Sequence, residues 1–177
     1  MNPTIITQPR ILIAGIGNIF LGDDAFGIEV LRRLTEQPLP DGVEAIDFGI
    51  RGFDLACAIQ GGYESVILVD ATPRGGTPGT LYVLELDVDA LTTDQPEPEF
   101  EGHSLTPAKV LQLVTMLGGP LPNLRLVGCE PATLGSLDQT QMGLSPAVAA
   151  AVDQALPLIS SLVEQLSCQR AAVAKSK

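Results

Sequence analysis

Residues 11–27 read Ile-Leu-Ile-Ala-Gly-Ile-Gly-Asn-Ile-Phe-Leu-Gly-Asp-Asp-Ala-Phe-Gly, and this stretch decides the fold. A continuously apolar run is typical of a parallel strand that is covered on both faces. The run leads through a glycine turn to two adjacent carboxylates, Asp23 and Asp24, where a helix pattern begins. Open α/β sheets place their chemistry where strands end and helices begin. The stretch therefore predicts an α/β fold with a functional site beside these acids.

The rest of the chain alternates between strand and helix patterns. Strands are expected at residues 10–14, 43–47, 65–70, 80–86 and 124–130, and helices are expected to begin near Asp24, Gly52, Pro107 and Pro146. This order predicts a three-layer α/β sandwich with a mostly parallel, twisted five-stranded sheet flanked by helices. The fourth strand is expected to be an antiparallel edge strand.

Two local expectations and the domain limits follow from the same patterns. Asp23 or Asp24 is expected to cap the first helix, and Pro157 is expected to kink or break the last one. Residues 1–9 are interpreted as an N-terminal extension, 10–168 as a single domain and 169–177 as a flexible tail.

Composition and charge narrow the possible partners. The formal net charge of −11 over 177 residues argues against nucleic acid, which needs clustered Lys and Arg, and against an anionic membrane surface. No apolar run is expected to reach the roughly 18 residues that span a bilayer, and the first nine residues lack the order of a signal peptide. The three cysteines, Cys57, Cys129 and Cys168, are far apart and form neither a disulfide framework nor a zinc site. These features favour a reducing cytoplasm.

Asp24, Asp70 and His103 are the candidate site residues. Asp24 follows the first expected strand and Asp70 ends the third, and these strands are often adjacent in parallel sheets, so both carboxylates would reach one crevice. His103 is the only histidine and precedes an expected helix N-terminus, which favours the neutral imidazole that binds metals.

The residues themselves leave the chemistry open. Two carboxylates and an imidazole form an open divalent-metal site, and two carboxylates alone can form an acid/base pair. Each residue also has an ordinary structural explanation: a helix cap for Asp24, a turn for Asp70, and a surface or core position for His103.

The ordered motifs resemble those of the NiFe-hydrogenase maturation endopeptidases from about Arg10 to Leu166. They are G-x-G-N-x-x-x-x-D-D-x-x-G at 15–27, D-x-G-x-x-G at 47–52, a strand ending in Asp70, the lone His103, the segment Leu126–Pro131, and Gly143–Pro146.

The resemblance implies an endopeptidase that removes a C-terminal extension from the hydrogenase large-subunit precursor after nickel insertion. Its metal contacts would be Asp24, Asp70 and His103, although the family often has Glu where this chain has the shorter Asp24. The nickel would belong to the substrate, and no tightly held cofactor is expected. The precursor's cysteine thiolates would complete the coordination, which makes cleavage conditional on nickel.

The resemblance also suggests how the remaining site residues act. Asp24 or Asp70 would activate water while the metal polarises the scissile carbonyl. The substrate cleft would include residues of the first two turns, namely Gly17, Asn18, Asp47, Gly49 and Gly52. The free enzyme is expected to be a cytoplasmic monomer without nucleic-acid or membrane partners.

Three alternatives compete with this interpretation. A dinucleotide-binding domain would use Gly15, Gly17 and Asp47, but Phe20 occupies the third glycine position and would obstruct a pyrophosphate. A cysteine hydrolase would use Cys129 with His103 and Glu130. A nickel-dependent chaperone would bind the precursor through the same residues without cutting it.

Overall fold

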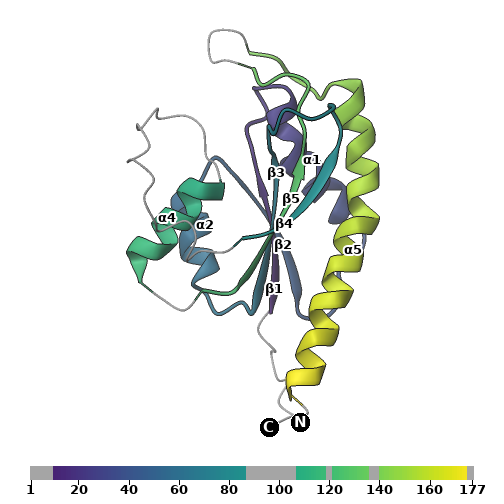
Figure 1. Ribbon diagram of the computed structural model, residues 1–177. Coiled ribbons are helices and arrows are strands. Elements are labelled where there is room, and N and C mark those ends of the chain that lie inside the picture. The colour runs from purple at the N-terminus through teal and green to yellow at the C-terminus, as the bar shows by residue number, and fades with distance from the viewer. Residues whose placement is uncertain (1–9, 87–106, 119–120, 136–139, 175–177) are drawn as a thin grey trace.

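The centre of the protein is a five-stranded sheet, seen in the computed structural model, which describes residues 10–86, 107–118, 121–135 and 140–174 (Figure 1). Its strands are β1 (Ile11–Ile16), β2 (Val43–Gly49), β3 (Ser65–Ala71), β4 (Leu81–Glu85) and β5 (Asn123–Cys129). They lie in the order β2-β1-β3-β5-β4, and all neighbours are parallel except β4, which pairs antiparallel with β5 at the edge. The predicted adjacency of the first and third strands is confirmed, as is the antiparallel edge strand.

Helices cover both faces of the sheet and complete the predicted three layers. Figure 1 shows α1 (Phe26–Leu34) and α5 (Pro146–Ala174) on one side, and α2 (Gly52–Ile59) and α4 (Pro107–Leu117) on the other. Residues alternate along each central strand between the two cores. In β1, Ile13 packs toward the α1 and α5 side, whereas Leu12 packs toward the α2 and α4 side.

Helix α5 differs from two expectations. It continues through Pro157 without a break, and it extends to Ala174, past the expected start of the tail. Pro157 lies on the exposed side of the helix, where water can solvate the carbonyl that loses its helical partner.

The segment Pro146–Cys168 of α5 is also long and apolar enough to cross a membrane by length and composition, with a mean hydropathy of 1.4. The expectation that no run reaches that length was therefore wrong. Val148, Val152 and Ile159 of this segment are buried in the core against α1 and the sheet, and 39% of the segment is buried in all.

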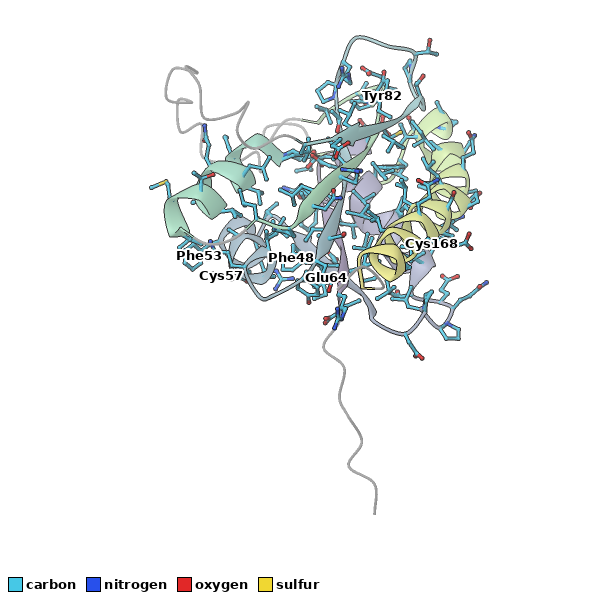
Figure 2. The ribbon with its side chains drawn as sticks, turned by 60° about the horizontal axis from the view of Figure 1, so that its bottom comes forward. Phe48, Phe53, Cys57, Glu64, Tyr82 and Cys168 are labelled. Carbon is cyan, nitrogen blue, oxygen red and sulfur yellow. The ribbon has the colours of Figure 1, made fainter. Side chains whose placement is uncertain are left out.

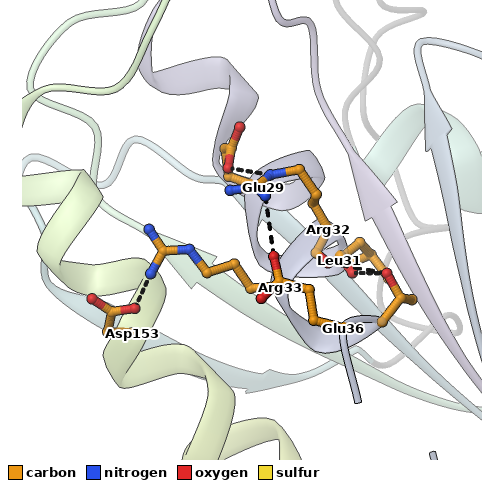
Figure 3. A network of polar contacts seen from close by, with 7 residues as sticks. Glu29, Leu31, Arg32, Arg33, Glu36 and Asp153 are labelled. Atoms are coloured by element: carbon orange, nitrogen blue, oxygen red, sulfur yellow. Dashed lines mark hydrogen bonds and ion pairs between the residues drawn. The ribbon is translucent and has the colours of Figure 1, made fainter. Parts of the chain in front are cut away.

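One surface ion pair connects the two helices on this side, and two others lie within α1 and just after its end. The guanidinium of Arg33 on α1 pairs with Asp153 on α5, and Arg32 bonds Glu29 at 3.0 Å and Glu36 at 3.1 Å (Figure 3). Exposed pairs of this kind contribute at most about 1 kcal/mol each, so the packing of α1 must have another main cause.

That cause is a close approach between α1 and the sheet at Gly27. A Cβ atom at this position would lie 2.2 Å from the carbonyl oxygen of Val69 and 2.3 Å from that of Ile16. Only glycine allows the start of α1 to rest directly on β1 and β3. The short helix η1 (Asp23–Ala25) immediately precedes α1 and contacts β3, so this approach brings Asp24 toward Asp70.

We predict that Gly27→Ala lowers the free energy of unfolding by about 3 kcal/mol, because the added methyl group must displace backbone on two strands. Chemical denaturation monitored by circular dichroism measures the change. Gly42→Ala is the control: no atom lies within 4 Å of the added methyl, so only its positive φ matters, at about 1 kcal/mol. A Gly27→Ala protein as stable as Gly42→Ala would contradict the role of the close approach.

Candidate functional site

Asp24 and Asp70 lie together at the carboxyl edge of the sheet. Asp70, next to the end of β3, is only 4% exposed. Its pKa is raised well above the ordinary value, first by burial and then by the negative charge of Asp24, with one opposing hydrogen bond from the Ala71 backbone. Burial also raises the pKa of Asp24, against a bond from the Asn18 backbone N–H to Oδ2 of 2.8 Å. The two acids therefore lie close enough for the charge of Asp24 to act on Asp70, and their shared crevice stays a prediction.

This pair can take part in two kinds of chemistry. Two neighbouring carboxylates that resist double ionisation can hold and pass a proton, or they can bind a cation that neutralises them. Within the described ranges, no group of three or more His, Cys, Asp or Glu side chains is placed to hold a metal ion. A metal at this pair would need a further ligand from elsewhere. His103, the third expected ligand, lies outside the described residues.

Glycines of two turns sit beside the pair. A Cβ atom at Gly17 would lie 1.9 Å from the backbone oxygen of Asp24, so only glycine fits there. The Gly17 N–H donates to the Gly49 carbonyl at 3.1 Å, which joins the turns after β1 and β2. Of the expected cleft residues, Gly17 and Asn18 thus contact Asp24, and Gly49 is bonded to Gly17. Asp47, near the end of β2, and Gly52, the first residue of α2, lie on either side of Gly49 in the second turn.

Asp23 has a different role from the one expected. It is 1% exposed and accepts hydrogen bonds from the backbone of Ala132 (2.8 Å), Thr133 (3.2 Å) and Ser145 (2.6 Å), and from the Ser145 hydroxyl (2.9 Å). Neither η1 nor α1 has a side-chain cap. The prediction that Asp23 or Asp24 caps the helix was wrong, because the Asp23 carboxylate binds loops that are distant in sequence.

Glu130 is a second anchoring carboxylate, which the sequence interpretation considered only as a partner of Cys129. It accepts bonds from the backbone of Arg74 (2.9 Å) and Gly75 (3.0 Å) and from the hydroxyl of Tyr82 (2.8 Å) on the edge strand (Figure 2). Burial raises its pKa, but these bonds outweigh burial and the net pKa is lowered. Glu130 therefore fixes the loop that follows Asp70. The sequence signal was an acid at the end of a buried strand.

Cys129 is unsuited to act as a nucleophile. Its side chain is fully buried, and burial, followed by the charges of Asp23 and Glu130, raises the pKa of the thiol to about 12. Nucleophilic cysteines need an accessible thiolate near neutral pH. The geometry therefore argues against the cysteine-hydrolase alternative.

A pocket of about 410 Å³ lies elsewhere, between the end of α1, the 37–43 segment and α5. Its lining includes Leu39, Val43 and Leu156 but neither Asp24 nor Asp70. We therefore assign the candidate site from the acids and not from this hollow.

Comparisons with known proteins agree with the fold. A family model described as hydrogenase maturation protease matches residues 28–162. The hydrogenase 2 maturation protease of Escherichia coli is 33% identical over 159 residues, which cover 88% of this chain and 92% of the relative. The solved structure of the E. coli hydrogenase maturating endopeptidase HybD has a TM-score of 0.70 at 32% identity and covers 88% of this chain and 93% of that chain. A NiFe hydrogenase maturation protease, HycI from Thermococcus kodakarensis, has a TM-score of 0.63 at 25% identity, with 89% and 94% covered.

We predict that Asp70→Asn stabilises the protein at pH 8. The pKa of Asp70 is near 3.9 in the unfolded chain and higher in the folded protein. The stabilisation linked to its protonation is therefore fully present below about pH 3.9, and it is lost as the pH rises through the folded-state pKa. The neutral amide avoids that loss. Thermal unfolding at pH 8 should show a melting temperature roughly 2–4 °C higher, and the gain should shrink toward pH 4. Asp54→Asn, an exposed acid on α2, is the control and should show no such gain. A lower melting temperature for Asp70→Asn at pH 8 would refute the assignment.

A second prediction concerns Asp23. Replacing it with alanine leaves the part-buried backbone donors of two loops without this partner and empties the space of a buried side chain, so Asp23→Ala should lower the free energy of unfolding by about 3 kcal/mol. Asp153→Ala, which removes only the exposed pair with Arg33, should cost less than about 1 kcal/mol. Ser145→Ala should add little on top of Asp23→Ala, because the two residues share a bond. Additive effects in the double variant would show that the bond does not stabilise the fold.

Proposed function

Since this chain belongs to the hydrogenase maturation protease family and is therefore a peptidase, we propose that it removes a C-terminal extension from a NiFe-hydrogenase large-subunit precursor after nickel insertion. The observation that carries this proposal is the pairing of Asp24 with Asp70 at the carboxyl edge of the sheet. Both acids lie where an open α/β sheet presents its chemistry.

In this proposal the two carboxylates recognise nickel that the precursor carries. A buried pair of like charges is unfavourable by itself, and a divalent cation between the carboxylates relieves that repulsion. His103 would supply a third ligand, and the precursor would supply cysteine thiolates, the softer ligands that this site lacks. Neither partner then holds the metal as well as both together, so precursor binding depends on nickel.

The same acids would carry out the hydrolysis. With the scissile carbonyl polarised, one carboxylate of the pair accepts a proton from the attacking water and then passes it to the departing amine. The turns at Gly17, Asn18, Asp47, Gly49 and Gly52 would line the cleft for the substrate tail.

We further propose that the enzyme works as a monomer in the cytoplasm. Its net charge of −11 disfavours nucleic acid and anionic membrane surfaces as partners.

The test is the intact mass of the precursor, nickel-loaded or nickel-free, after incubation with this protein. Loss of a C-terminal peptide from the nickel-loaded form alone is the expected result. Asp24→Ala and Asp70→Ala should each reduce the cleavage rate by at least about 100-fold, the usual contribution of an acid/base group. His103→Ala should also reduce the rate, because it removes a proposed nickel ligand. Cys129→Ala, at a buried position outside the acid pair, should retain the normal rate.

Two results would overturn the proposal. Normal cleavage by the Asp24→Ala and His103→Ala variants would show that these residues do not have the roles assigned to them. A stable complex with no change in mass of either form would indicate a chaperone that binds the precursor without cutting it.

A further inference from the structure

Four exposed apolar side chains lie on neighbouring backbone segments, one of which leads directly from the turn that bonds Asp24. They are Ile19 (43% exposed), Phe20 (51%), Leu134 (47%) and Met142 (73%), and we call them the apolar rim. The described residues expose ten large apolar side chains in all, so four of the ten occur in this one place. Apolar side chains scattered singly over a surface are ordinary, but a contiguous group marks an interaction site.

Backbone hydrogen bonds bring the three segments of the rim together. The Gln141 N–H donates to the Phe20 carbonyl at 3.0 Å, the Gly22 N–H donates to the Gln141 carbonyl at 2.6 Å, and the Gly135 N–H donates to the Leu21 carbonyl at 3.1 Å. Isolated bridges pair Leu21 with Gln141 and Gly22 with Leu134. The rim residues thus lie on neighbouring segments although they are far apart in sequence.

The segments of the rim are also bonded to one buried side chain. The buried carboxylate of Asp23 binds Ala132, Thr133 and Ser145, which flank the second and third segments. A surface that is already ordered loses little conformational freedom when a partner binds. The fold therefore keeps apolar side chains exposed, where they do not contribute to its stability by burial.

The position of the rim identifies its occupant. Asn18, whose N–H bonds Asp24 at 2.8 Å, is followed directly by Ile19 and Phe20. An extended peptide advances about 3.4 Å per residue, so a chain whose scissile bond lies at the acids passes the rim within a few residues. A second copy of this chain is a poor occupant, because two molecules that each carry a charge of −11 repel one another.

We propose that the apolar rim binds apolar side chains of the precursor close to the bond that is cut, and that it thereby selects the sequence that the enzyme accepts. This inference rests on the proposed function. It assigns Phe20 and Met142 as specificity-determining residues that contact the substrate and leave the hydrolysis itself to Asp24 and Asp70.

The experiment compares Phe20→Ser, Met142→Ser and the double variant with Met116→Ser. Met116 is a matched control: it is 82% exposed near the end of α4, a helix that leads to the opposite, amino end of β5. The double variant should raise KM for nickel-loaded precursor about tenfold, as expected from losing the burial of an apolar side chain, with kcat within about twofold. The Kd for the precursor should rise by the same factor, and melting temperatures should not change.

A precursor with serine in place of the apolar residues nearest the cut completes a double-mutant cycle. For the wild-type enzyme, KM and Kd should rise on this substrate by the same factor of about ten as expected for the double variant on the normal precursor. For the double variant, the change of substrate should raise them little further. Additive losses, an unchanged KM and Kd in the double variant, or an equal effect of Met116→Ser would each overturn the proposal. So would a concentration-dependent dimer, seen by sedimentation, that disappears in the double variant while KM is unchanged.

Failure of the proposed cleavage and failure of the rim proposal give different results in this experiment. If wild-type protein binds the precursor without cutting it, the Kd comparison still decides whether the rim is the contact. If wild-type protein neither binds nor cuts the precursor, both proposals are refuted.

Discussion

The buried carboxylate of Asp23 is the interaction on which the carboxyl edge of the sheet depends. It joins the turn after β1 to the loop after β5 and to the start of α5, using four hydrogen bonds. A carboxylate is costly to bury unless its oxygens are satisfied. Here three of the four donors are backbone groups of loops outside the main sheet, and the fourth is the Ser145 hydroxyl. The next residue is Asp24, so the bonds that hold the loops together also fix the position of the candidate site.

Asp23 and Asp70 are both almost fully buried, yet their environments are opposite. Asp23 is surrounded by donors, whereas Asp70 faces the negative charge of Asp24 and gains one backbone bond. A buried acid that is well satisfied stabilises a fold, and one that is poorly satisfied costs stability. Poorly satisfied acids persist mainly where a site needs them. This contrast separates an anchoring residue from a functional one more clearly than sequence position does, since Asp23 and Asp24 are adjacent.

The sequence predicted the parts of the fold that depend on local patterns. Continuous apolar runs marked the buried parallel strands, and the usual adjacency of the first and third strands placed Asp24 near Asp70. It could not reveal the bonds of Asp23, because their partners at Ala132 and Ser145 lie more than 100 residues away along the chain. It could not show that α5 continues through Pro157 without a break, because only the packing of the helix shows which side faces water. The role of His103 remains a prediction from resemblance.

The acid pair and the apolar rim have complementary tasks because the site lies at the carboxyl ends of the central strands β1 and β3. Two carboxylates at strand ends can bind a cation, but they offer few contacts that distinguish one peptide sequence from another. In the proposal, the carboxylates recognise that the precursor carries nickel, and the rim recognises the sequence that lies beside the metal. Since Asp23 holds both features through one set of bonds, a substrate that fits the rim would also be aligned with the acids. Selection and hydrolysis would then depend on the same preorganised structure.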